Sequence, residues 1–316
     1  MLEYDFVEKE KLIMNNINTN KLTVTLLSLE QIYGDKRLKI FDKFGIKAEL
    51  NDFAILCGAY VANGLEHNLG VYWTNEADGN DATYAVFPNG KSRPLYVCSR
   101  RAGIRPVLTY SSILNASNII KDFGDGILEV EFFEYPQMSV SVEMQNILEN
   151  LYNNNHLLAT GRCYTTDLSK YTSYNEGFKK NEYIEYEYDK ERYVRVKANS
   201  CFNGMEFVLS NKEKYADDDY VWVKVSPIKW YVDKEADVAV SKNLLLSGLQ
   251  FNEEKKYKGD FENVTLCYFL NTYFIQEIMR HKYEDVNAIN QGDTFRSGLD
   301  NLNKTIKNIY RKVRKR

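Results

Sequence analysis

Residues that build metal and redox centres are scarce in this chain. Its 316 residues include three histidines and five cysteines, and the cysteines form no CxxC pair. No histidine has a second histidine or a carboxylate at a metal-binding spacing such as HExxH, and no GxSxG, Walker or GxGxxG motif occurs. The sequence therefore predicts no metal, no cofactor and no catalytic residue, and so no enzyme. It predicts that the cysteines are buried, reduced thiols.

Long apolar runs and proline-rich stretches are absent as well. No run approaches the ~20 apolar residues that a membrane-spanning helix needs, and only five prolines occur. The N-terminal stretch MLEYDFVEKEKLIM is acidic early and lacks the apolar core of a signal peptide. We expect a cytoplasmic protein without a membrane span.

Charge is unevenly distributed. The net charge is −3, but residues 304–316 hold seven lysines or arginines and no acid. The rest of the chain carries 34 basic and 44 acidic residues, a net charge of −10, which argues against nucleic-acid binding by the main domain. We expect residues 283–316 to form a linker and a basic amphipathic helix. This helix could dock on the acidic body, bind an anionic surface or pair with a partner helix.

Aromatic residues, in contrast, are abundant. The 24 tyrosines and 16 phenylalanines, with tryptophan, make up 14% of the chain, and such side chains suit half-buried strands. Short alternating segments separated by Gly and Asn turns predict many strands. Pro136 is expected to end the strand that contains it. The expected strands cover 70–74, 82–87, 95–99, 104–110, 127–136, the hairpin 183–198, and 217–233.

Helix signals separate these strands. Ser28 and Gln31 have the spacing of a capping box, in which each side chain satisfies an orphan amide of the first turn. Asn51 or Asp52 can cap another helix. Longer helices are expected over 141–155 and 263–279. Strands and helices together predict an α+β fold, with mixed or antiparallel sheets flanked by helices.

The segment from 72 to 110 carries a familiar set of residues. A tryptophan strand, YWTN, is followed by a glycine-bearing hairpin and then by RAGIRPVLTY. The pattern resembles the closing half of bacterial C-type-lectin-like domains. That group includes formylglycine-generating-enzyme-like proteins, the variable proteins of diversity-generating retroelements, and a large uncharacterised family of gut Firmicutes. The matching residues are Trp73, Gly90, Gly103, Ile104, Arg105 and Pro106.

A second region is similar to the opening half of the same family, through YPQ, PIKW and FLN motifs. Because the closing half comes first in this chain, the resemblance implies a circular permutation. The alternative is a dimer in which two incomplete halves complete each other between chains. The expected divisions are an N-terminal segment 1–22, a permuted C-type-lectin-like domain 23–282 and a tail 283–316. The permuted domain itself is divided into a closing half 23–110, a connector 111–127 and an opening half 128–282.

The permuted arrangement makes structural predictions. Since the first and last strands pair in this fold, the strand with Pro106 is expected beside the strand with Phe132. A different neighbour would overturn the arrangement, and with it the binding surface inferred from the resemblance. Arg105 is expected to be buried against a carbonyl or a carboxylate, because a buried guanidinium must be paired. Trp73, Arg105, Pro106 and Trp230 are all expected to be structural, with Pro106 at an edge or a bulge.

The resemblance also implies a binding surface between residues 63 and 101, the interval that varies in the diversity-generating relatives. Tyrosine and arginine, which are typical binding anchors, recur in it. An acidic stretch at 75–81 is interpreted as a polar hairpin turn, with calcium binding as the alternative. The predicted ligand or partner contacts are Tyr72, Asn75, Glu76, Asp78, Arg93, Tyr96, Arg100 and Arg101.

The predicted function is non-catalytic binding. We expect a bacterial or phage protein that recognises another protein, or a glycan, through the 63–101 face. One alternative is a phage-encoded inhibitor of a host defence nuclease, comparable to an anti-CRISPR protein, which the acidic, aromatic-rich composition suggests. Another is an oxidase of the formylglycine-generating type. That chemistry needs paired cysteines near the closing strands, where only Cys98 occurs.

Overall fold

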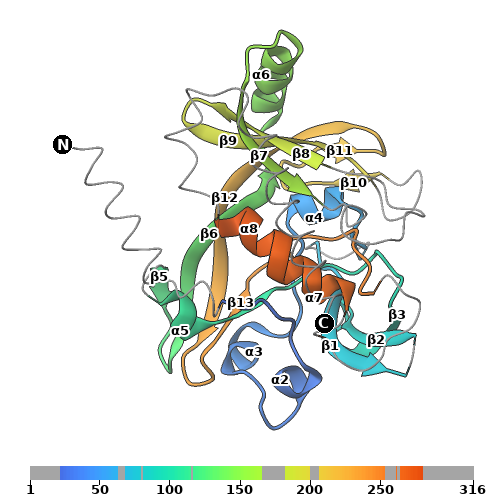
Figure 1. The fold of residues 1–316 in the computed structure, drawn as a ribbon, viewed down its shortest axis with the longest axis vertical. Helices are drawn as coiled ribbons and strands as arrows, with labels where there is room; N and C mark the ends of the chain where they lie inside the picture. Colours follow the sequence, from blue (N-terminus) through green and yellow to red (C-terminus); the bar gives the residue numbers. More distant parts are fainter. Residues whose placement is uncertain are drawn as a thin grey trace, which may run out of the picture.

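Two long antiparallel strands, β6 (Ile127–Ser139) and β12 (Tyr220–Asp233), form the spine of the fold (Figure 1). They pair from Ile127 opposite Asp233 to Ser139 opposite Val223. The structure is a computed structural model. It describes residues 22–62, 68–79, 81–114, 117–165, 182–199, 206–252, 261 and 264–279.

The remaining strands of the main sheet extend from this pair. On the edge of β12 opposite β6, β13 (Val238–Ser241) pairs with one end and β9 (Glu191–Lys197) with the other. The outer strands are β4 (Val107–Thr109) beside β13, β8 (Glu182–Tyr188) beside β9, β7 (Leu158–Thr165) beside β8, and β5 (Asn118–Asp122) beside β6. All these pairs are antiparallel. The protein is therefore a strand-rich α+β protein with antiparallel sheets, as predicted.

Two small sheets and several short helices complete the described part. The small sheets are β1 (Tyr72–Asp78), β2 (Ala82–Val86) and β3 (Ser92–Tyr96), and the pair β10 (Phe207–Val208) and β11 (Lys214–Tyr215). The helices are α2 (Leu29–Tyr33), α3 (Lys39–Phe44), α4 (Asp52–Leu56), α5 (Tyr110–Ile113), α6 (Val142–Asn153), α7 (Thr265–Phe269), the π-helical turn η2 (Leu270–Phe274) and α8 (Ile275–Met279).

Local signals for helix ends are confirmed. Ser28 and Gln31 form both hydrogen bonds of the capping box on α2. Asn51 rather than Asp52 caps α4, because its Oδ1 accepts the backbone N–H of Ala54 at 2.7 Å. Gly45, in the left-handed region at φ 75°, ends α3. These contacts span only a few residues, which is why the sequence alone predicts them.

The prediction that Pro136 ends its strand is wrong. β6 continues through Pro136 to Ser139, with Pro136 opposite Val225. The register shifts at this point, between Lys224 and Val225 of the partner strand. A proline is tolerated inside a paired strand where the ladder is irregular, because no regular hydrogen bond then depends on its missing N–H.

The expected neighbour of the Pro106 strand is also wrong. Pro106 immediately precedes β4, and β4 pairs with β13 rather than with β6, the strand of Phe132. Both β13 and β12 lie between β4 and β6 in the sheet. The physical reason is that β13 folds back on β12 as a tight hairpin and so occupies the position that the prediction gave to the Pro106 strand.

One hydrophobic core contains residues from both predicted halves. Phe44 of α3 stacks on Tyr231 of β12, with ring centres 4.0 Å apart. The ring of Trp73 lies 5.5 Å from that of Phe251. The two predicted halves therefore share one core and do not form two separate cores. The predicted N-terminal segment, apart from Leu22, and the basic tail 283–316 lie outside the described residues.

Candidate functional site

The small sheet β1–β2–β3 carries most of the interval predicted to bind a partner (Figure 1). In the described part, β3 pairs only with β2, and three of its residues are exposed: Arg93, Pro94 and Tyr96. Tyr96 is 66% exposed. We call these three residues the β3 edge. A proline on an edge strand discourages strand pairing, so the β3 edge offers side chains rather than backbone to a partner. Residues 63–67 and Asn80 of the interval lie outside the described residues.

Tyr72 does not face a partner, and the prediction is wrong for it. Its side chain is fully buried, because the first half of β1 is covered on both faces. Its hydroxyl donates to the carbonyl oxygen of Ile46 at 2.7 Å. Burial raises the pKa of Tyr72 to about 12 although Arg105 lies close by. Tyr72 is therefore part of the core.

The polar residues at the end of β1 are engaged in internal contacts. Glu76 Oε1 accepts the backbone N–H of Leu29, the first residue of α2, at 2.7 Å. Asp78 Oδ1 accepts the hydroxyl of Tyr84 at 3.1 Å. Asn75 is half-buried, and its backbone N–H bonds to the segment before α2. The described residues contain no group of three or more side chains suited to a metal ion. These contacts favour the hairpin interpretation over calcium binding.

The three predicted arginines have different surroundings. The guanidinium of the exposed Arg93 lies 5.9 Å from the ring centre of Phe87. Arg101 is exposed, whereas Arg100 is half-buried, and burial lowers the pKa of its guanidinium. Backbone carbonyls of Arg100 and Arg101 accept hydrogen bonds from other segments. The structure thus places Arg93 and Tyr96 on one strand and the other two arginines in a following, anchored loop.

Arg105 is buried and paired with carbonyl groups, as predicted. Its Nε donates to the carbonyl oxygen of Ser241 at 3.0 Å, and its Nη1 to that of Ile46 at 3.4 Å. The guanidinium also lies 5.6 Å from the ring centre of Phe41 and 5.4 Å from that of Tyr72. Carbonyl oxygens and aromatic faces together compensate for burying the charge. The residue joins three segments of the core.

The other signature residues are also in structural positions. Trp230 Nε1 donates to the carbonyl oxygen of Phe132 at 2.9 Å, which fixes β12 against β6. Pro106 is buried just before β4, an outer strand of the main sheet. Trp73 is fully buried against Phe251, and its indole N–H finds no acceptor within the described ranges.

The cysteines give no support to oxidase chemistry. In the described part Cys57 is buried, Cys98 and Cys267 are half-buried, and Cys163 is exposed, so the prediction of burial is confirmed for Cys57 and wrong for Cys163. Burial raises the pKa of Cys57 to about 12, which keeps its thiol protonated. Cys201 lies outside the described residues.

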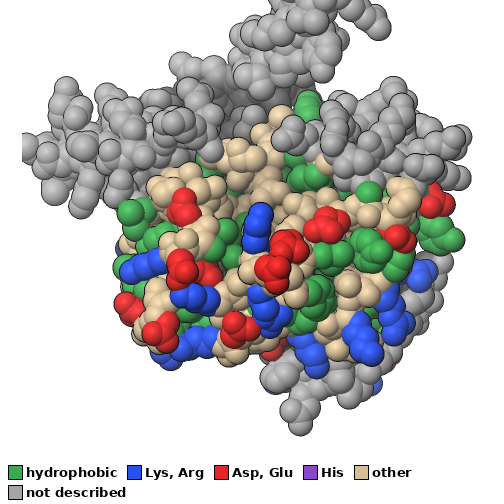
Figure 2. All heavy atoms as spheres, turned by 90° about the horizontal axis from the view of Figure 1, so that it is seen from below, with side chains coloured by type: hydrophobic (Ala, Val, Ile, Leu, Met, Phe, Trp, Pro, Cys, Tyr) green, Lys and Arg blue, Asp and Glu red, His purple; other side chains and the backbone are tan. Residues whose placement is uncertain are grey.

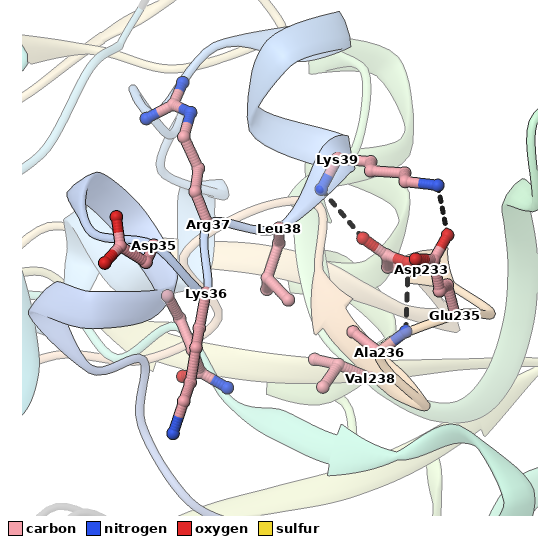
Figure 3. A pocket seen from close by; sticks show the side chains of 10 residues that line it. Asp35, Lys36, Arg37, Leu38, Lys39, Asp233, Glu235, Ala236 and Val238 are labelled. Atoms are coloured by element: carbon pink, nitrogen blue, oxygen red, sulfur yellow. Dashed lines mark hydrogen bonds and ion pairs between the residues drawn. The ribbon is translucent and has the colours of Figure 1, made fainter.

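An open pocket of about 400 Å³ lies between the α2–α3 turn and the β12–β13 turn (Figure 3). Lys39 pairs with the Glu235 carboxylate, and its backbone N–H donates to Asp233 Oδ2 at 2.7 Å. Asp233 Oδ1 accepts the N–H of Ala236 at 3.2 Å. The N-cap residue of α3, Leu38, makes no side-chain cap bond, so Asp233 caps this helix from the other half of the chain. We interpret this pocket as a structural joint.

A second hydrophobic cluster forms where α6 packs on the sheet, and no sequence motif predicted it. Its buried members are Leu148, Tyr193 and Trp222. Arg195 braces it through two hydrogen bonds to Glu149, of 2.7 and 2.9 Å. Beside the cluster lies an open cavity of about 350 Å³. The alternation of aromatic residues along β8, β9 and β12 was the available signal, but alternation does not show which helix covers the face.

Two buried carboxylates, Glu185 and Glu277, were also missed. Tyr164 donates to Glu185 Oε2 at 2.6 Å, Thr160 donates to Oε1 at 2.9 Å, and Arg162 lies 3.4 Å from Oε2. Glu277 accepts a backbone N–H of β7 at 2.8 Å. Both carboxylates are therefore paired, and we interpret them as ties between β7, β8 and α8. The period-two pattern of YIEYEY, which turns Glu185 inward, was the sequence signal.

Comparisons with protein-family models, with curated proteins and with solved structures give no match for this chain. In the described ranges, no helix combines the length and apolar character needed to cross a bilayer. On the face shown in Figure 2, basic and acidic side chains are interspersed. That face shows no large field of one sign, of the kind that typically accompanies nucleic-acid binding. Function is therefore inferred from the contacts of the described residues.

Proposed function

We propose that the protein is a non-catalytic binding protein of bacterial or phage origin that recognises another protein through the β3 edge. The exposure of Tyr96 carries this proposal. Tyr96 and Arg93 point to opposite sides of an edge strand, and pairing with Ala82 and Ala85 of β2 fixes both. Tyrosine and arginine on a rigid strand can anchor a partner with a small loss of side-chain entropy.

The permuted C-type-lectin-like arrangement is not part of this proposal, because β4 pairs with β13 and not with β6, the strand of Phe132. The pairing of β4 with β13 and the hydrogen bond from Arg105 to Ser241 instead join the GIRP motif to the strand after PIKW. The proposal for the β3 edge rests on the exposure of Tyr96 and not on that arrangement.

Affinity capture from bacterial lysate, with quantitative mass spectrometry, tests the binding proposal. Tyr96→Ala is expected to lower recovery of a specific partner about tenfold, since an anchor residue contributes roughly 1–2 kcal/mol or more. Leu158→Ala is the matched control, because Leu158 is 70% exposed and lies on β7 of the main sheet. Equal recovery with both variants would contradict the proposal.

The identity of the partner separates the alternatives. A large basic nuclease whose binding weakens in salt would favour the inhibitor interpretation. A glycan array in which Tyr96→Ala abolishes binding, with no protein partner in the capture, would replace protein recognition by glycan recognition at the β3 edge.

A further inference from the structure

The cavity beside α6 has the composition of a ligand site rather than of a packing gap. Among the described residues, its walls contain two tyrosines, two asparagines and one leucine, and none of these described lining residues is charged. Its volume of about 350 Å³ lies within the range of small-molecule sites. The lining residues are Tyr152, Asn153, Asn155, Leu157 and Tyr186.

The rings of the cavity are held in place from behind. Tyr152 and Tyr186 meet edge to face with ring centres 5.7 Å apart. Both also pack on the buried Trp222, at 5.8 and 5.7 Å. The Arg195 guanidinium lies 4.6 Å from the ring centre of Tyr152. The aromatic wall is therefore preformed, which reduces the side-chain entropy lost on binding.

The surrounding charges disfavour an ionic ligand. Arg195 and Glu149 form a bidentate pair, and the hydrogen bonds from Arg195 lower the pKa of Glu149. The two charges thus persist and neutralise each other. The Arg195 guanidinium also already occupies the position over Tyr152 that a ligand cation would take.

The geometry also disfavours a flat aromatic ligand such as a nucleobase. Stacking a base between two rings requires roughly parallel rings, whereas those of Tyr152 and Tyr186 are inclined at 89°. Perpendicular rings form a corner rather than a parallel-sided slot. A corner of this kind suits a puckered molecule with an apolar face and a polar rim.

The two asparagines supply polar groups at that corner. Asn155 follows the C-terminus of α6 in the left-handed region at φ 56°, and its exposed carboxamide makes no hydrogen bond within the described ranges. Asn153 also lines the cavity, and its carboxamide carries both donor N–H groups and an acceptor oxygen. A carboxamide can donate to one hydroxyl and accept from its neighbour, which matches a vicinal diol.

We propose that this cavity binds a neutral saccharide, with one sugar face against a tyrosine ring and its hydroxyls bonded to Asn153 and Asn155. The site lies on α6 and β8, so it is separate from the β3 edge and goes beyond the binding function proposed there. Protein recognition at one surface and sugar binding at the other are tested independently.

Saturation-transfer difference NMR on the full chain, with methyl glycosides of glucose, galactose, mannose and N-acetylglucosamine as probes, tests the proposal. At least one probe is expected to give saturation signals and a millimolar affinity. Asn155→Gly is expected to weaken it about fivefold to tenfold, because it deletes the carboxamide while the backbone keeps its left-handed conformation. Tyr186→Phe is expected to weaken it less, since the ring stays.

Two controls keep the test specific. Asn154→Ala is expected to leave sugar binding unchanged, because the Asn154 carboxamide bonds to Asn150 and does not line the cavity. Tyr96→Ala is also expected to leave it unchanged. The proposal is overturned if none of the glycosides binds, if Asn155→Gly and Asn154→Ala weaken binding equally, or if adenosine or choline binds at this site instead.

Discussion

The carboxamide of Asn271 pairs with both backbone groups of Val24. Its Oδ1 accepts the Val24 N–H at 2.9 Å and its Nδ2 donates to the Val24 carbonyl at 2.9 Å, across 247 residues of chain. The side chain thus acts like one residue of a neighbouring strand. Asn271 belongs to the FLN motif of the second half, and Val24 to the segment before the capping box of the first, so this contact closes the fold.

Replacing Asn271 should therefore destabilise the protein strongly. Asn271→Ala leaves the N–H and the carbonyl of the buried Val24 without partners, and each unsatisfied buried group costs about 1–3 kcal/mol. We expect the free energy of unfolding in urea to fall by about 2–5 kcal/mol. Thr272→Ala, at the half-buried neighbouring position, should change it by less than about 1 kcal/mol. Similar losses for both variants would contradict this role.

The pairing of Arg105 predicts that lysine cannot replace it. Lysine keeps the charge, but it lacks the planar fork that reaches Ser241 and Ile46 and lies near two aromatic rings. We expect Arg105→Lys to lower the midpoint of thermal unfolding, with a loss of about 2–4 kcal/mol. Arg93→Lys, on the exposed β3 edge, is the control and should leave the midpoint nearly unchanged.

Two buried acids predict a loss of stability at alkaline pH. Burial raises the pKa of Cys57 from 9.0 and that of Tyr72 from 10.0, both to about 12. Above its pKa in the unfolded state, 9.0 for Cys57 and 10.0 for Tyr72, each group loses its proton when the protein is unfolded but keeps it when the protein is folded. Rising pH therefore favours unfolding. The stabilisation by each group is fully present below its unfolded pKa. Between its unfolded and its folded pKa, each group lowers the free energy of unfolding by about 1.4 kcal/mol per pH unit.

Guanidinium unfolding measured across pH 8 to 12 checks this prediction. In the Cys57→Ala variant the contribution that begins near pH 9 should vanish. The contribution from about pH 10 should remain, because it comes from Tyr72 and from two other buried tyrosines whose pKa burial raises, Tyr135 and Tyr164. Tyr72→Phe, conversely, should reduce the contribution that begins near pH 10 and leave the one that begins near pH 9. A profile that Cys57→Ala leaves unchanged would show that this thiol is not the group that titrates.

Alanine substitutions at two glycines distinguish the stability cost of backbone strain from that of steric overlap. Gly248 and Gly79 both have a left-handed backbone, at φ 81° and 75°. A Cβ on Gly248 would lie 2.6 Å from the carbonyl oxygen of Cys57, whereas no atom of the described residues lies within 4 Å of one on Gly79. Each change to alanine should cost about 1–2 kcal/mol through the backbone, and Gly248→Ala an additional 1–3 kcal/mol in urea unfolding. Equal costs would argue against the close approach to Cys57.

Features set by neighbouring residues could be predicted from the sequence. The capping box of Ser28, the cap at Asn51 and the glycine stop after α3 depend on a few consecutive positions. The hairpin of β8 and β9 follows the same rule, because Asp189 and Lys190 take the left-handed conformation that its tight turn needs. The pairing of Arg105 was predicted because it lies in an apolar segment, and a guanidinium that is buried there must be paired.

Strand neighbours and exposed sites could not be predicted in this way. Whether β4 lies beside β6 or β13 depends on where a hairpin some 130 residues later folds back. Tyr72 and Tyr96 both occur in alternating segments, and only the packing of Arg105 and the edge position of β3 show that one is buried and the other exposed. The cavity at Tyr186 likewise depends on where α6 lands on the sheet.

The closure of the sheet by β13 has a consequence during synthesis. When the first half has left the ribosome, the Ser241 carbonyl that pairs with Arg105 is still 136 residues away along the chain, and the carboxamide that completes Val24 is 247 residues away. The nascent polypeptide must therefore keep a tryptophan-bearing, tyrosine-rich segment unassembled until almost the whole described domain has been translated. A chaperone that shields aromatic segments should raise the yield of native protein, whereas slow translation before residue 241 should lower it, because it prolongs the exposure of the unassembled segment.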